Sequence, residues 1–352
     1  MRLLAFLLAT AIVAPTFGSD NVSSSLRYRS YRNWSTNLPA EQWFKVNDGI
    51  RIKHAGGDKF AVKLDGERLQ FDTDGDGQID RTIKALVDRD TNVSTSRVIL
   101  SGKTTDGKPL KYAVRLRKDT AGWEWAPGGA MIGSIETKAG PIPVRVIDQN
   151  GNGRFDDIGK DAMVVGTGDD ATFLSQTVVI GKELRQFQMS ADGTELSTTA
   201  FTGKTAKLDL TTSFDAKAVL LAAIVRSKDG KNSFNVASAK GAVTVPAGTY
   251  EIVSGTVGLG NQRVGVRQGR MKPIVLAENA TQSVEWGGPV KGEFEFVRVA
   301  GQVQFSPDTV WFYGDAGEEY YGWVPCGKSP EFTVKDKVSG QVIEVAILPG
   351  SC

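Results

Sequence analysis

The sequence predicts an all-β protein of short antiparallel strands, divided into more than one domain. Glycine is abundant, with 40 residues in a chain of 352, and glycine suits the tight turns that join strands because it tolerates positive φ. Short runs of alternating apolar and polar residues recur, and Asp-Gly pairs separate several of them, which is typical of β-hairpins. The chain is longer than one ordinary domain, so we expect two or three.

The first 42 residues are expected to lie outside these domains. Residues 1–18 combine Arg2 with an apolar run, Leu3–Val13, that is too short to span a bilayer. This is the pattern of a secretory signal peptide, with a retained N-terminal anchor as the alternative. Residues 19–42 are polar and lack periodicity, which predicts a mobile leader or a loosely docked arm.

Residues 43–200 predict the first β domain. Phe60, Val62 and Leu64 alternate as in a half-buried strand. The hairpin turns expected in this domain are Asp65-Gly66, Asp106-Gly107 and Asp192-Gly193.

Residues 204–299 predict a second β domain. The mostly apolar run Ala218–Arg226 ends at turn residues, which favours a buried strand over a short helix. Val245–Ile252 places a Pro/Gly turn before a strand and resembles the corresponding turn of transthyretin-like and carboxypeptidase-regulatory-like sandwiches. That resemblance implies a β-sandwich and no activity. Residues 300–352 are rich in aromatic and β-branched residues, and form either a small immunoglobulin-like module or the completion of the preceding sandwich.

Two stretches share the pattern D-x-[DN]-x-[DN]-G-x-x-D: Asp72–Asp80, the first motif, and Asp148–Asp156, the second motif. In this pattern, side-chain oxygens at positions one, three, five and nine converge with the carbonyl oxygen of position seven. The glycine at position six permits the sharp turn around the ion. A shell made only of oxygen predicts a hard cation, calcium; a solvated Asp/Gly turn without metal is the alternative.

The first nine residues of each motif resemble EF-hand loops, but the likeness ends there. An EF-hand has a bidentate Glu at position twelve and flanking helices, whereas here position twelve is Ile83 or Gly159. The motifs are more similar to the shortened calcium loops between strands of integrin-type propellers, in which position nine closes the shell. That resemblance implies one calcium ion per motif, two in all. The ligands it implies are Asp72, Asp74, Asp76, the carbonyl of Gln78 and Asp80, and then Asp148, Asn150, Asn152, the carbonyl of Arg154 and Asp156.

The two motifs differ in charge. The first offers four carboxylates and the second two carboxylates and two amides, so we expect the first site to be the tighter. Asp157 and Asp161 lie close enough in sequence to contribute to the second. Ions in loops between strands usually stabilise a fold, and no hinged helix pair is predicted for binding to switch. We therefore expect structural ions, with a calcium sensor as the alternative.

Other candidate sites have a structural explanation beside the functional one. Trp123 and Trp125 would share one face of a strand, either as a low-ranked platform for sugar rings or as core aromatics. The acidic pairs Asp169-Asp170 and Glu318-Glu319 could serve glycoside hydrolysis, although neighbours on a strand point to opposite faces. The single histidine, His54, is expected on an exposed strand surface.

The cysteine content bears on the compartment. Cys326 and Cys352 are the only cysteines, and in an oxidising compartment we expect them to form a disulfide, with two free thiols as the alternative. So few cysteines in an exported chain favour a bacterial source.

The net charge of +2 favours neither a nucleic-acid nor a membrane partner, and no segment after residue 18 is apolar enough to span a membrane. We expect a non-catalytic, calcium-binding protein that is secreted, periplasmic or at the cell surface. Its expected role is interaction or scaffolding with a protein or polysaccharide of the cell envelope. Carbohydrate binding by the tryptophan pair and carboxylate-based hydrolysis are the alternatives.

Overall fold

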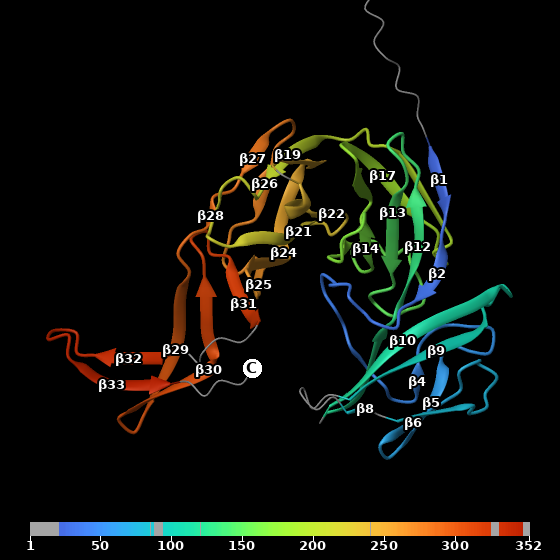
Figure 1. Ribbon diagram of the computed structural model, residues 1–352, viewed down its shortest axis with the longest axis horizontal. Helices are drawn as coiled ribbons and strands as arrows, with labels where there is room; N and C mark the ends of the chain where they lie inside the picture. Colours follow the sequence, from blue (N-terminus) through green and yellow to red (C-terminus); the bar gives the residue numbers. More distant parts are fainter. Residues whose placement is uncertain are drawn as a thin grey trace, which may run out of the picture.

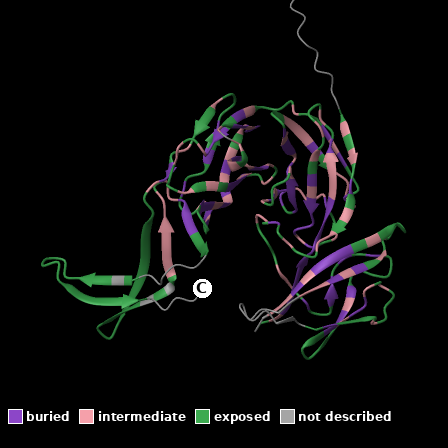
Figure 2. Cartoon of the chain, viewed as in Figure 1, coloured by how far each residue is buried: buried purple, intermediate pink, exposed green. Residues whose placement is uncertain are grey.

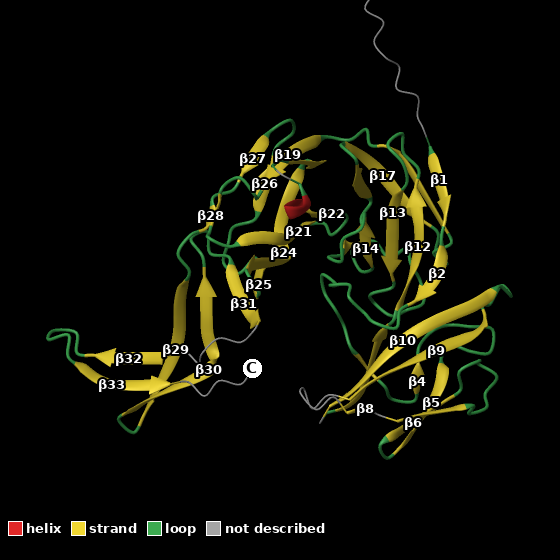
Figure 3. Ribbon diagram, viewed as in Figure 1, coloured by secondary structure: helices red, strands yellow, loops and turns green. Residues whose placement is uncertain are grey.

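The computed structural model describes residues 21–84, 86–87, 94–119, 121–239, 241–324 and 331–347. Within these ranges the regular secondary structure is strand apart from one short 3-10 turn, η1 (Val236–Ser238), which confirms the all-β prediction (Figure 3). In the described part of the chain, no helix has the length and hydropathy of a membrane span. The predicted signal peptide, residues 1–18, and both cysteines, Cys326 and Cys352, lie outside the described residues.

The chain forms an arch, and its described residues contain two large hydrophobic cores and one small hydrophobic cluster (Figure 1). The first core runs from Leu26 to Leu196 and fills one limb of the arch. The second runs from Ala206 to Tyr320 and lies in the other limb, where residues 291–299 at the far end are exposed (Figure 2). Each limb buries its own apolar side chains, and both candidate metal motifs belong to the first.

Four sheets make up the N-terminal region in its described residues. One contains β1 (Val22–Ser25), β18 (Glu195–Ala200), β17 (Glu183–Met189) and β16 (Thr177–Ile180). A second contains β3 (Phe44–Lys45), β11 (Gly122–Pro127), β10 (Pro109–Asp119), β9 (Ser94–Lys103) and β8 (Leu86–Val87). A third contains β15 (Thr172–Phe173), β14 (Ala162–Val165), β13 (Ile142–Ile147), β12 (Gly129–Ile135) and β2 (Arg27–Ser30). The fourth contains β4 (Gly49–Ile50), β5 (Phe60–Asp65), β6 (Arg68–Phe71) and β7 (Arg81–Lys84).

The predicted leader is wrong where the structure describes it. Within residues 19–42, β1 pairs with β18 and β2 pairs with β12, so both are edge strands of the N-terminal region. Leu26, between them, is 6% exposed and belongs to the first core. The strand partners of this segment lie about a hundred or more residues away along the chain, and they fix a conformation that local sequence does not favour.

The predicted hairpin turns are confirmed. Asp65-Gly66 joins β5 to β6, Asp106-Gly107 joins β9 to β10, and Asp192-Gly193 joins β17 to β18. The three glycines have φ between +57° and +83°, a region that non-glycine residues rarely adopt.

The C-terminal region is organised around one large sheet. In spatial order its strands are β22 (Ser233–Asn235), β21 (Val219–Ser227), β24 (Gly248–Leu259), β25 (Gln262–Arg267), β31 (Glu319–Val324), β30 (Gln302–Tyr313) and β29 (Lys291–Val299), with β26 (Ile274–Leu276) paired to β24. Three smaller sheets accompany it among the described residues. They are β23 (Val243–Pro246), β19 (Thr205–Asp209) and β27 (Thr281–Ser283); β20 (Phe214–Asp215) and β28 (Trp286–Gly287); and β32 (Glu331–Lys335) and β33 (Val342–Ile347).

Two predictions for this region can be compared with the sheet. The run Ala218–Arg226 forms the strand β21, as expected; it is buried from Ala222 to Val225, whereas Val219 and Leu221 are exposed. Of the two alternatives for residues 300–352, the pairing of β31 with β25 extends the preceding sheet. The hairpin of β32 and β33 forms a separate two-stranded sheet, and its described side chains are exposed (Figures 1 and 2).

Candidate metal centre

Both motifs fold as the loops of β-hairpins. The first hairpin loop connects β6 to β7, and the pair Phe71↔Arg81 closes it, so Asp72 and Asp80 face each other at its base. The second hairpin loop connects β13 to β14, and the pair Ile147↔Ala162 closes it. The residues at the base of the second loop are therefore Asp148 and Asp161, which extends this loop beyond the second motif.

The two loops share a backbone conformation. The glycines at positions four and six have positive φ in both: +75° at Gly75, +90° at Gly77, +68° at Gly151 and +83° at Gly153. A side chain at these positions would be strained, because L residues disfavour this region. The loops therefore wrap in the way that the motif predicts.

In the first loop, Asp72 is 3% exposed and anchors the turn. Its two carboxylate oxygens accept the N–H groups of Gly75 at 2.8 Å and Gly77 at 2.9 Å. Oxygens of Asp72, Asp74 and Asp80 lie within 4.8 Å of one another, which is close enough for one cation to contact all three.

Asp76, a further predicted ligand of the first loop, lies outside this group. Asp76 is exposed, and its Oδ1 accepts the N–H of Gln78 at 2.7 Å. Thr73 holds the closing residue, because its backbone N–H at 3.2 Å and its hydroxyl at 2.7–2.9 Å donate to the carboxylate of Asp80.

The first loop concentrates negative charge. The backbone N–H of Asp76 lowers the pKa of Asp74, but lost hydration and the neighbouring carboxylates outweigh this hydrogen bond, so the pKa of Asp74 is raised overall. Carboxylates that repel one another in this way favour a bound cation between them.

His54 supports the first loop from inside, so its predicted exposed position is wrong. The imidazole is 4% exposed and stacks on Phe60 with ring centroids 4.0 Å apart. Its Nδ1 donates to the carbonyl of Ile52 at 3.0 Å. A Cβ on Gly75 would lie 2.4 Å from the His54 ring, so the loop glycine packs directly on the imidazole.

In the second loop, Asp148 is 1% exposed and accepts three hydrogen bonds. Asn152 N–H reaches Oδ1 at 3.1 Å, while Gly153 N–H and the Tyr112 hydroxyl reach Oδ2 at 2.6 and 2.8 Å. Burial raises the pKa of Asp148 to about 6, although the hydrogen bonds from Tyr112 and the loop backbone oppose the shift.

The polar side chains of the second loop gather on Asp157 rather than on Asp156. The amide groups of Asn150 and Asn152 both donate to Asp157 Oδ2, at 2.8 and 2.5 Å. Asp156 is instead paired with Arg154, whose guanidinium nitrogens lie 2.7 and 3.1 Å from its carboxylate oxygens. The backbone N–H of Arg154 donates to Asn152 Oδ1 at 2.8 Å.

Asp161 is the most deeply buried carboxylate of the second loop, with no exposed surface. Its Oδ2 accepts the Asp157 N–H at 3.0 Å, but its Oδ1 has no hydrogen-bond partner, and neither has Asn150 Oδ1. Burial, followed by the charge of Asp148, raises the pKa of Asp161 to about 9. Buried oxygens without a donor are uncommon and costly, and a cation would satisfy them.

Aromatic and apolar side chains seat the second loop in the first core. Phe155, at motif position eight, is 5% exposed and packs edge-on against Tyr28 with ring centroids 6.3 Å apart. A Cβ on Gly151 would come within 2.9 Å of both Phe44 and Trp125. The loop is therefore held by the core on more than one side.

The tryptophan pair does not form an exposed platform, which corrects that alternative. Trp123 and Trp125 are each 4% exposed and belong to the first core. Trp125 packs against Phe44 with ring centroids 5.0 Å apart. Alternation along β11 places both indoles on one face, and that face is covered, so stacking on a sugar ring would require the core to open.

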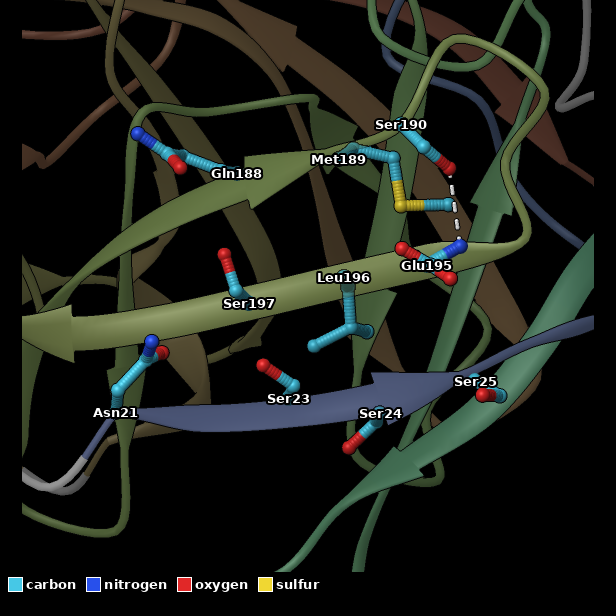
Figure 4. Close-up of a pocket in the computed structure, with 10 residues that line it drawn as sticks. All are labelled: Asn21, Ser23, Ser24, Ser25, Gln188, Met189, Ser190, Glu195, Leu196 and Ser197. Atoms are coloured by element: carbon cyan, nitrogen blue, oxygen red, sulfur yellow. Dashed lines mark hydrogen bonds between the residues drawn. The ribbon is translucent and has the colours of Figure 1, made fainter.

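A hollow of about 510 Å³ lies over β1, β18 and β17 (Figure 4). Serines dominate its lining, and Glu195 is its one carboxylate. Within it, the Glu195 N–H donates to Ser190 Oγ at 2.9 Å (Figure 4). A hollow of about 380 Å³ lies over β2, β12 and β13, and the charged residues that line it are Arg27, Arg29 and Arg145. Neither hollow brings two carboxylates together.

The two acidic pairs have separate surroundings. Asp169 pairs with Arg145 at 3.3 Å, and Asp170 accepts the amide of Asn37 at 2.9 Å. Glu318 is fully buried and accepts the Gly287 N–H at 2.7 Å, and burial raises its pKa.

Its neighbour Glu319 points the other way and forms two hydrogen bonds with Arg267, at 2.6 and 2.9 Å. The two carboxylates therefore have different partners, and Glu318 Oε2 has no hydrogen-bond partner.

No protein-family model, curated protein or solved structure matches this chain. The ligand of this chain is therefore inferred from the residues of its two hairpin loops.

Proposed function

We propose that this chain is an exported, non-catalytic β protein that binds two calcium ions, one in each hairpin loop. The observation that carries the proposal is the common geometry of the two loops. Each places a buried aspartate at the base of a hairpin, Asp72 or Asp148, and wraps the backbone around its carboxylate through glycines with positive φ. Oxygen ligands in such a loop suit calcium.

The proposed role of the ions is to stabilise the N-terminal region. Each loop continues at both ends into paired strands of the first core, so a bound ion links strands that are already in place. Binding then lowers the free energy of the folded state without moving a hinged element.

The proposed setting is the cell envelope, with an interaction or scaffold role toward a protein or polysaccharide. The pattern of residues 1–18 supports export, and calcium outside the cytoplasm fills sites with Kd as weak as about 10⁻⁴–10⁻³ M. N-terminal sequencing of the mature protein tests the export step, and a start at Ser19 is expected. A mature chain that retains residues 1–18 would contradict signal cleavage.

Calcium binding is tested on the full mature chain after removal of metal. Isothermal titration calorimetry should show two equivalents of calcium, and a variant with both Asp72→Ala and Asp148→Ala should bind none. The thermal midpoint should rise with calcium, by the equivalent of about 2.7 kcal/mol for each site at a hundredfold excess over Kd. Far-UV circular dichroism at room temperature should barely change. Absence of calcium uptake by the wild-type chain at millimolar concentration would overturn the proposal.

A further inference from the structure

We propose that Asp161, together with Asp157, closes the second calcium site in place of Asp156, and that this makes the second site the tighter of the two. The inference rests on the proposed calcium binding and specifies the ligands of one site. It reverses the order of affinity that the motifs predict, since the motif alone gives the first site more carboxylates.

The first argument is the position of the closing residue in the hairpin. In the first loop, the ninth motif residue, Asp80, is also the last residue before the returning strand, opposite Asp72. In the second loop, the ninth motif residue and the last residue before the returning strand are different residues, because the strand begins later. The residue opposite Asp148 is Asp161, directly before β14. Ligation from both strands at the base of the hairpin therefore selects Asp161.

The second argument is that Asp156 is engaged elsewhere. Its carboxylate forms two hydrogen bonds with the guanidinium of Arg154, and that guanidinium is half exposed. The amide groups of Asn150 and Asn152 converge instead on Asp157 Oδ2. Rotation of the Asn150 amide by 180° would bring its oxygen to face that carboxylate. The Asn150 oxygen and Asp157 Oδ2 would then face each other, an arrangement that a bound cation stabilises.

The third argument is the buried oxygen of Asp161. Its Oδ1 has no hydrogen-bond partner although the residue has no exposed surface. The hydrogen bonds that Asp148 and Asp161 receive come from neutral groups, namely backbone N–H groups and the Tyr112 hydroxyl. Two buried carboxyl groups are tolerated only if one is protonated or a positive charge compensates them, and a divalent cation at the base of the loop supplies that charge.

These ligands imply tight binding. Asp148, Asp157 and Asp161 give the second loop three carboxylates, although their oxygens are not gathered within 4.8 Å of one another as those of Asp72, Asp74 and Asp80 are. The loop that carries them is seated in the core. In the first site, by contrast, Asp74 and Asp80 are exposed. Calcium affinity rises with the charge and the rigidity of the ligand set, so the second site has the advantage in rigidity while nearly matching the first in charge.

The test compares Asp161→Asn with the matched control Asp156→Asn in the full mature chain. Each variant removes one carboxylate oxygen and one charge at nearly constant size. In calcium titrations against a competing chelator, Asp161→Asn should raise the dissociation constant of the tighter site at least tenfold. Asp156→Asn should leave the dissociation constants of both sites within about twofold of wild type. Asp157→Asn should weaken the same site as Asp161→Asn.

The Asp161→Asn variant also shows whether Asp161 binds calcium or is only a buried protonated acid. If Asp161 only carries a proton, the neutral amide replaces it and both calcium constants stay unchanged, which would overturn the inference. Weakening by Asp156→Asn alone would also overturn it and would restore the motif assignment. If the wild-type chain takes up no calcium at all, the proposed function fails, which is a different result.

A second measurement distinguishes loss of binding from misfolding of the variant. Terbium in the second site should be sensitised through Tyr112, whose hydroxyl contacts Asp148. Luminescence should fall in Asp161→Asn and persist in Asp156→Asn, with the circular dichroism of both variants matching wild type. A folded Asp161→Asn variant with unchanged luminescence would count against the inference.

Discussion

The two hairpin loops carry nearly the same nine-residue motif in different surroundings. The first loop ends at its ninth residue, and its outer carboxylates, Asp74 and Asp80, face solvent. The second runs on to Asp161, and both residues at its base are buried. The comparison shows that the hairpin, more than the motif, determines which residues meet at the base of the loop.

The loops also differ in how they are anchored to the core. Position eight is Phe155 in the second loop, which is buried among core residues, whereas it is the half-buried Ile79 in the first. A Tyr112 hydroxyl supports the first aspartate of the second loop. The stacked ring of His54 supports the glycine turn of the first. The second loop should therefore contribute more to the stability of the N-terminal region.

The largest expected effect comes from removing the anchor at position eight. Phe155→Ala should lower the free energy of unfolding by about 3–5 kcal/mol, the usual cost of truncating a buried phenylalanine. Ile79→Ala, its matched control in the first loop, should cost about 1 kcal/mol because Ile79 is only half buried. Urea unfolding in saturating calcium measures both values. Equal costs would show that the two loops are anchored alike.

His54→Ala should have an intermediate effect that is confined to the first site. Loss of the stacked ring beneath Gly75 should cost about 1–2 kcal/mol of stability. Calcium affinity at the first site should fall severalfold, because the glycine turn loses its support. The constant of the second site should stay unchanged. An equal loss at both sites would mean that the sites are coupled.

Tyr112→Phe should give the smallest effect, on the second site alone. The change deletes one hydroxyl and its hydrogen bond to Asp148 at 2.8 Å. The free energy of calcium binding at the second site should become less favourable by about 1 kcal/mol. Tyr28→Phe is the control, because Tyr28 stacks on Tyr112 while its hydroxyl accepts the Ala113 N–H. Calorimetry should show weaker calcium binding in Tyr112→Phe only. Equal constants in the two variants would remove Tyr112 from the account of the second site.

Local sequence patterns predicted much of the fold. Asp-Gly turns located three hairpins, and the apolar run at 218–226 located a strand. Segments paired over long distances escaped prediction. Val22–Ser25 is rich in serine and becomes a strand only because β18 lies beside it. Likewise, alternation placed Trp123 and Trp125 on one face, but which face is covered depends on packing between sheets.

For the two candidate metal sites, too, the sequence predicted the features that depend on local structure. The motif spacing identified both loops and their first aspartates, since those positions depend only on local turn geometry. It assigns the closing ligand of the second loop to Asp156, whereas we propose Asp161, because the motif fixes position nine and carries no information about where the strand returns. A signal for Asp161 was present in the sequence: an aspartate stands directly before the apolar run Ala162–Val165, as Asp80 stands directly before Arg81–Lys84.

The most direct test of the account is hydrogen exchange of the full chain, measured by mass spectrometry with calcium and with chelator. Calcium should slow exchange most in peptides covering residues 142–165, less in residues 68–84, and not at all in residues 205–287. That pattern would place the stabilising effect at the bases of the two hairpins and rank the second above the first. Unchanged exchange throughout, or protection centred on the C-terminal region, would contradict the account.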